Sequence, residues 1–163
     1  MTIRTALFLP RRTTAALTGA AVGALLLAGC SFNADVTTAK PYAASDGIAV
    51  TVSGVTVQNL MVVSTGAGEQ AVVLGSFTNT GTADAVVQLQ SASSSPTVDV
   101  PAGTTVRLGA GEAETTVLLT SKAEPGGLEP MYVGVTGADS VRVDVPIMDG
   151  TLPEYQDVAA TLG

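Results

Sequence analysis

Between Ile48 and Met148 the chain alternates apolar and small polar residues in short runs, and glycine or proline separates one run from the next. In the clearest run, one strand face would carry Val141, Val143, Val145 and Ile147. An alternation of period two is typical of a half-buried β-strand. About eight such runs follow one another with glycine-rich turns and no amphipathic helical pattern. The sequence therefore predicts an all-β fold, an immunoglobulin-like antiparallel β-sandwich.

The residue types available for a core agree with this fold class. Hydrophobic residues make up 46% of the 163-residue chain, but aromatic residues make up only 4%. Valine, leucine, isoleucine and alanine must therefore fill the interior. β-Branched side chains suit the pleated, half-buried surface of a sheet. The chain is long enough for one domain with a core of its own.

The first 29 residues have the composition of a bacterial secretory signal. Three arginines precede an uncharged apolar stretch, residues 13–29, and the next residue is Cys30. A lipobox, after which the chain is cut and the cysteine is lipidated, is predicted at Leu27, Ala28, Gly29 and Cys30. The stretch is short for a retained span across about 30 Å of hydrocarbon. Arg11-Arg12 leaves twin-arginine export open beside the general route.

These features divide the chain into a signal peptide at 1–29, a lipidated flexible tether at 30–46, a β-sandwich domain at 47–148 and a C-terminal tail at 149–163. Fully extended, the small polar tether reaches at most about 55 Å. The tail either docks on the sandwich or frays from residue 156, and Tyr155 is expected to pack rather than to bind. The predicted location is the extracytoplasmic face of the cell membrane, with the lipid on Cys30 as the anchor.

Net charge excludes one large class of partners. Once residues 1–29 are removed, four basic residues face fourteen acidic ones, which gives a formal net charge of −10. A chain this acidic lacks the basic patch through which proteins bind nucleic acids and anionic lipid surfaces. We therefore expect no nucleic-acid partner.

The residues offer little for catalysis. The sequence contains no histidine, and its single cysteine is Cys30, which the lipid would occupy. The commonest general base and a thiol nucleophile are therefore both lacking. Ser121-Lys122 has the residue types of a nucleophile and a base, but adjacent residues of a strand point to opposite faces. We expect no enzyme, and no serine or threonine hydroxyl beside Lys122 or beside a buried carboxylate.

Two sets of metal ligands remain as alternatives. Thioethers bind Cu(I), and the predicted domain offers Met61, Met131 and Met148. Each methionine can equally fill a gap in the core. Carboxylates for a calcium site are offered by Glu112, Glu114, Asp139, Asp144 and Asp149. No acidic calcium-loop motif is present, so we expect solvated carboxylates, no bound metal and no cofactor.

Three segments, FTNTGTADAVV, VPAGTTVRLGAGE and GVTGADSVRVDVPIM, resemble the PCu(A)C periplasmic copper-chaperone domain. The resemblance covers roughly residues 48–148 and implies a cupredoxin-like β-sandwich. That family has a histidine before the Pro-Ala-Gly turn and a His-x-Met after its Gly-Gly. Here no histidine precedes the turn, and Glu112-Ala113-Glu114 follows Gly111. The resemblance therefore implies the scaffold without the family's copper site. The lipobox, KPYAASDG and DGTLPEY are similar to actinobacterial lipoproteins of the LpqE type, which are grouped with that family.

The sequence thus predicts a membrane-anchored, non-enzymatic binding or accessory module for an envelope protein or assembly. Edge strands and the loops at residues 91–95 and 121–127 are the expected contact surfaces. The alternative is a copper-chaperone-like metal carrier that uses the methionines.

Overall fold

Nine strands and one helix make up the described part of the chain, residues 45–163 of the computed structural model. They are β1 (Ile48–Val52), β2 (Val55–Ser64), β3 (Gln70–Asn79), β4 (Ala85–Gln90), β5 (Thr97–Val100), β6 (Thr105–Leu108), β7 (Val117–Thr120), β8 (Leu128–Val135), β9 (Ser140–Met148) and α2 (Pro153–Ala160). The predicted signal peptide, the lipobox and most of the predicted tether lie outside these residues. In the described part, no helix has the length and hydropathy needed to cross a membrane.

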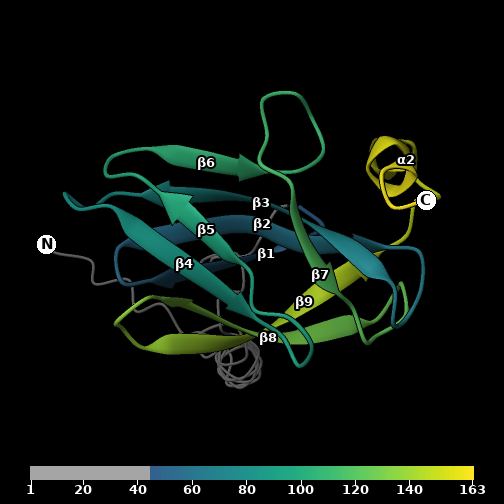
Figure 1. The fold of residues 1–163 in the computed structure, drawn as a ribbon, viewed down its shortest axis with the longest axis horizontal. Coiled ribbons are helices and arrows are strands. Elements are labelled where there is room, and N and C mark those ends of the chain that lie inside the picture. Colours follow the sequence, from purple (N-terminus) through teal and green to yellow (C-terminus); the bar gives the residue numbers. More distant parts are fainter. Residues whose placement is uncertain (1–44) are drawn as a thin grey trace, which may run out of the picture. The chain divides into compact units, whose positions relative to one another are not determined.

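The strands form one curved sheet that nearly closes into a barrel (Figure 1). Hydrogen-bonded neighbours follow the order β5-β4-β8-β9-β2-β3-β6, with β1 added to β2 and β7 added to β3. The strand pairs are antiparallel except for β2 with β9, where Val62 lies beside Ile147 and Val63 beside Met148. This parallel pair joins two antiparallel groups of strands into one sheet. The predicted all-β fold is confirmed.

Aliphatic side chains from both groups of strands fill the interior. Along β4, buried and exposed residues alternate from Ala85 to Gln90, as the period-two pattern requires. Phe77 is the one aromatic residue of the main core cluster. Around it pack fully buried residues of several strands, among them Val57, Leu60, Val62, Val73, Val87, Leu89, Met131, Val133 and Val145.

A bulge interrupts β2 near its middle. The register with β3 shifts between Gln58 and Met61, and Asn59 adopts a left-handed φ of 53°. Asparagine enters this conformation more readily than most residues with a side chain. Bulges bend a strand and redirect a side chain, often next to a functional site. Here the bulge brings Asn59 to the outer face of the sheet, opposite to the main core.

The C-terminal tail forms helix α2, which the sequence pattern did not predict. Pro153 stands in its first turn, where a backbone N–H has no partner within the helix, and Glu154 follows it. Tyr155, Val158 and Ala159 have the i, i+3, i+4 spacing of one helix face. They belong to a second apolar cluster on the outer face of the sheet, together with Met61, Val63, Leu74 and Met148. The tail therefore docks on the strands, and Tyr155 packs.

Candidate functional site

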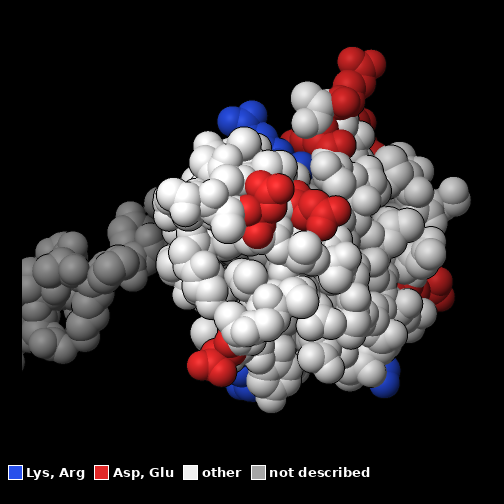
Figure 2. All heavy atoms as spheres, turned by 60° about the vertical axis from the view of Figure 1, so that its left-hand side comes forward, with Lys and Arg blue, Asp and Glu red and all other residues white. Residues whose placement is uncertain are grey.

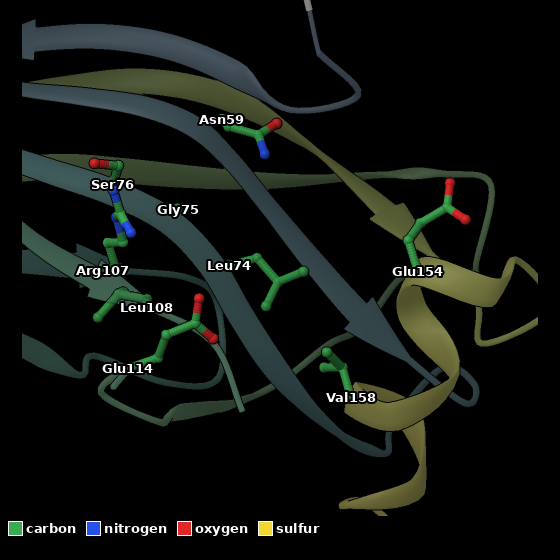
Figure 3. Close-up of a pocket in the computed structure, with 9 residues that line it drawn as sticks. All are labelled: Asn59, Leu74, Gly75, Ser76, Arg107, Leu108, Glu114, Glu154 and Val158. Atoms are coloured by element: carbon green, nitrogen blue, oxygen red, sulfur yellow. The ribbon is translucent and has the colours of Figure 1, made fainter. Parts of the chain in front are cut away.

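An open cleft of about 320 Å³ lies between α2 and the outer face of β2, β3 and β6 (Figure 3). Its volume is at the lower end of the range for small-ligand sites, roughly 300–1,000 Å³. Residues from four elements and from the loop between β6 and β7 line it: Asn59, Leu74, Gly75, Ser76, Arg107, Leu108, Glu114, Glu154 and Val158.

The Asn59 amide has a fixed orientation at the edge of this cleft. Its Oδ1 accepts a hydrogen bond from the Gly47 backbone N–H at 2.9 Å. The amide nitrogen consequently turns toward the cleft, as Figure 3 shows. Leu74 and Val158 line the same space from β3 and α2. The cleft thus offers a hydrogen-bond donor beside an apolar surface.

The Glu114 carboxylate is held by the loop that follows β6. Gly111 N donates a hydrogen bond to Glu114 Oε2 at 3.0 Å. A Cβ atom at Gly109 would collide with the same oxygen. The missing side chain at Gly109 therefore lets the carboxylate lie against the loop backbone. Thr116 Oγ1 donates to Gly109 O at 3.0 Å and ties this loop to the residues before β7.

Arg107 supplies positive charge to the cleft. It lies on β6 opposite Ser76 of β3 and is exposed to solvent. Within residues 45–163 one ion pair forms, between Arg142 Nη2 and Asp144 Oδ1 at 2.8 Å. The Arg107 guanidinium therefore has no carboxylate partner in this part of the chain, and its N–H donors are open to a ligand.

A hydrogen bond secures α2 beside the cleft. Tyr155 Oη donates to Asp46 Oδ2 at 2.6 Å and so links the helix to the beginning of the described chain. Burial of the ring, followed by the hydrogen bond and charge of Asp46 and by the charge of Glu154, raises the pKa of Tyr155 to about 12. The phenol thus stays protonated, and can donate to Asp46, at neutral pH.

The described part of the chain is acidic overall. Residues 45–163 contain thirteen acidic residues and three basic ones. On the face shown in Figure 2, acidic side chains lie singly or in small groups among uncharged residues. Arg107 therefore places a positive charge on a domain that is negatively charged overall.

The three candidate copper-binding methionines lie in two different places. Met61 and Met148 belong to the cluster beneath α2, on the outer face of the sheet. Met131 is fully buried in the main core, on the other face. At most two of these thioethers can therefore contribute to one site.

The surroundings of Ser121 correct an expectation from the sequence. Ser121 Oγ donates to Oε2 of the buried Glu129 at 3.3 Å, so a serine hydroxyl does lie beside a buried carboxylate. The expectation was wrong because β8 begins at Leu128, earlier than the sequence pattern indicates, and this places Glu129 among the inward residues of the strand. The same oxygen accepts the N–H groups of Lys122 at 3.0 Å and Ala123 at 3.4 Å. Because Ser121 is fully buried, the pair stabilises the loop and is closed to a substrate.

The two loops predicted as contact surfaces, residues 91–95 and 121–127, lie close together. Thr120 N, at the end of β7, donates to Ser94 Oγ at 2.9 Å. The first loop is closed by a hydrogen bond from Ser91 N to Ser94 O at 2.8 Å. The first loop is therefore hydrogen-bonded to the end of β7, directly before the second loop begins.

The remaining candidate residues are not gathered into a site. The lipidation signal of Leu27, Ala28, Gly29 and Cys30 lies outside the described residues. Glu112 is exposed in the loop that carries Glu114. The Thr151 hydroxyl and N–H donate to Asp149 and lower the pKa of its carboxyl group. Among residues 45–163, no group of three or more histidine, cysteine or acidic residues is placed to hold a metal ion.

No protein-family model matches the chain, and no curated protein sequence matches it. The apo PCuAC domain of PmoF2 is a similar solved structure: its TM-score is 0.50 at 13% sequence identity, over 64% of this chain and 97% of that domain. The fold is PCuAC-like. The copper-bound PCuAC domain from PmoF2 gives a TM-score of 0.47 at 14% identity, over 62% of this chain and 97% of that chain. At these identities the likeness concerns the fold alone, which is the cupredoxin-like sandwich that the resemblance implied.

Of the residues that line the cleft, sequence reasoning singled out only Glu114 and missed the others, among them Asn59, Arg107 and Glu154. Two signals were available for them. Asn59 interrupts the apolar pattern of β2, which is typical of a bulge, and Pro153-Glu154 precedes an i, i+3, i+4 set typical of a short helix. No signal in the sequence places Arg107 opposite them.

Proposed function

We propose that this chain is a lipoprotein, anchored through Cys30 to the extracytoplasmic face of the cell membrane, and that it is a non-enzymatic binding module for a component of the cell envelope. The observation that carries the binding role is the cleft beneath α2. It combines a guanidinium, carboxylates and an apolar surface in one concave site, as ligand sites do. The anchor rests on the lipobox that ends at Cys30.

The groups that line the cleft suit recognition better than turnover. Arg107 can only donate hydrogen bonds, and the Glu114 carboxylate is already bonded to the loop backbone. The chain contains no histidine to serve as a general base. The Ser121–Glu129 pair is buried away from the cleft. Binding without bond cleavage is the chemistry that these residues support.

Crosslinking of the full-length, lipidated protein in its native membranes tests this function. We expect Arg107→Glu to reduce capture of the envelope partner at least about tenfold, because an ion pair becomes a repulsion. Arg142→Glu is the matched control, since it makes the same charge change at an exposed position of β9 outside the cleft and the expected contact loops, and it should leave capture unchanged. Equal capture by Arg107→Glu, or by a chain limited to residues 1–46, would contradict the proposal.

A copper carrier is the second candidate function, and it depends on Met61 and Met148 sharing the cluster beneath α2. Thioether ligands select Cu(I). Titration of the full-length protein with Cu(I) against a competing chelator tests this candidate. A triple variant with leucine at positions 61, 131 and 148 should bind more weakly, and an equal affinity would rule the candidate out.

A further inference from the structure

We propose that the cleft beneath α2 binds a short aliphatic peptide by its two charged ends, with the ligand's carboxylate on Arg107 and its ammonium group on Glu154. This inference rests on the proposed binding function and names the ligand class for that site. It follows from the separation of charges across the cleft and from the apolar residues between them.

We assign the ligand's carboxylate to the side of the cleft where Arg107 offers hydrogen-bond donors. Arg107 has no carboxylate partner among residues 45–163. A guanidinium presents a planar fork of N–H donors that matches a carboxylate in two parallel hydrogen bonds. Ser76 lies opposite Arg107 in the sheet register and adds a hydroxyl to the same wall. The Asn59 amide nitrogen faces the cleft as a further donor.

We assign the ligand's ammonium group to the side of the cleft where the Glu154 carboxylate can accept its hydrogen bonds. Glu154, in the first turn of α2, lines the cleft on the side away from Arg107, with Leu74 between them (Figure 3). Glu114 lies on the side of Arg107 (Figure 3), where the Gly111 N–H holds its Oε2 at 3.0 Å, so Glu154 is the carboxylate at the far side. A zwitterion places its positive charge near Glu154 and its negative charge near the guanidinium. An anion would meet the carboxylates unfavourably, and a cation would leave Arg107 without a partner.

The size of the cleft and its apolar lining restrict the length and the side chains of the ligand. A free α-amino acid carries both charges on one residue, whereas the guanidinium and Glu154 come from different walls of the cleft. Two extended residues span about 7 Å, and a dipeptide fits within a cleft of about 320 Å³. Leu74 and Val158, both of the outer apolar cluster, line the space with apolar groups. Small aliphatic side chains such as alanine are therefore favoured.

Calorimetric titration of the full-length protein in detergent with three probes tests the assignment: the dipeptide Ala-Ala, N-acetyl-Ala-Ala, which lacks the ammonium group, and Ala-Ala amide, which lacks the carboxylate. We expect saturable binding of Ala-Ala, and at least about tenfold weaker binding when either end is blocked, because each blocked end loses a charge-assisted contact. No saturation by Ala-Ala, or equal affinity for either blocked form, would overturn the proposal.

Single substitutions then assign each end. Arg107→Gln should weaken Ala-Ala binding to the level of Ala-Ala amide and leave the affinity for Ala-Ala amide unchanged. Glu154→Gln should instead abolish the preference for Ala-Ala over N-acetyl-Ala-Ala. Lys122→Gln and Glu124→Gln are matched controls, because both residues are exposed on a loop outside the cleft. Equal losses in the controls and the cleft variants would also overturn the proposal.

The peptide ligand and the envelope-binding function can be rejected independently of each other. Absent Ala-Ala binding, combined with partner capture that Arg107→Glu abolishes, rejects the peptide ligand and keeps the binding function. Specific Ala-Ala binding by a protein that is found outside membranes, with no partner, keeps the peptide site and rejects the envelope role. Thermal unfolding of each variant verifies that these exposed substitutions leave the fold intact.

Discussion

Glu129 is a buried carboxylate on which a whole loop depends. One of its oxygens accepts hydrogen bonds from the Ser121 hydroxyl and from the N–H groups of Lys122 and Ala123. Glu129→Ala removes the acceptor of the two part-buried N–H groups, whereas the Ser121 hydroxyl keeps the Ala123 carbonyl oxygen as an acceptor at 2.9 Å. Each donor that is left unsatisfied away from water costs about 1–3 kcal/mol. We expect the free energy of unfolding to fall by about 2–4 kcal/mol in urea titrations.

Two other variants show whether this loss comes from the hydrogen bonds. Glu129→Gln keeps an acceptor oxygen in place, so it should cost less than the alanine variant. Glu112→Ala removes an exposed glutamate and should change the free energy of unfolding by no more than about 0.5 kcal/mol. If the alanine variants at 129 and 112 unfold at the same urea concentration, the loop does not depend on Glu129.

Tyr155 makes stability sensitive to alkaline pH. Its pKa rises from 10.0 to about 12 in the folded chain, because the ring is buried and the carboxylates of Asp46 and Glu154 are near. The stabilisation is therefore fully present below pH 10. It is lost as the pH rises toward 12, by up to about 1.4 kcal/mol per pH unit, because the unfolded chain releases the proton first.

Unfolding titrations across this pH range measure the effect. Tyr155→Phe removes both the ionisable group and the hydrogen bond to Asp46. We expect this variant to be less stable than the parent at neutral pH and to lose less stability between pH 10 and 12. An identical pH dependence in both proteins would show that another group is responsible.

Among the elements, α2 acts as a cover for two methionines. Tyr155, Val158 and Ala159 pack with Met61 and Met148 on the outer face of the sheet. In a chain that ends at residue 151, we expect hydrogen peroxide to oxidise these two methionines faster, whereas the main-core Met131 stays protected. Mass spectrometry of each methionine measures the rates. Faster oxidation of all three would show instead that the strands need α2 to remain folded.

The strands were predictable from sequence because most of them are half buried. Residues of β4 alternate strictly between core and solvent, and this periodicity is visible in the sequence itself. α2 was not predicted, since a helix of eight residues buries a single residue, Tyr155, and shows too little periodicity. The cleft was not predicted either. Asn59, Arg107 and Glu154 are far apart in the chain, and only the sheet register and the docked helix bring them together.

For the whole molecule, the sequence makes one sharp prediction, which concerns the lipid. Cys30→Ser removes the sulfur that would carry the acyl chains. We expect the variant to lose radioactive palmitate labelling and to move from the membrane fraction to the soluble fraction. Thr37→Ser, in the predicted tether, is the control and should stay lipidated. Membrane association of an unlabelled Cys30→Ser protein would mean that something other than this lipid holds the chain.

The parallel pair of β2 and β9 sets the order in which this domain can assemble. Val62 lies early in the domain and Ile147 near its end, so the sheet cannot close until the last strand has emerged. Contacts between such distant segments form slowly, because closing the long intervening loop costs entropy before the new contacts stabilise the fold. Export as an extended thread, one of the routes open to the proposed signal peptide, would benefit from this delay, because the chain stays unfolded until β9 arrives.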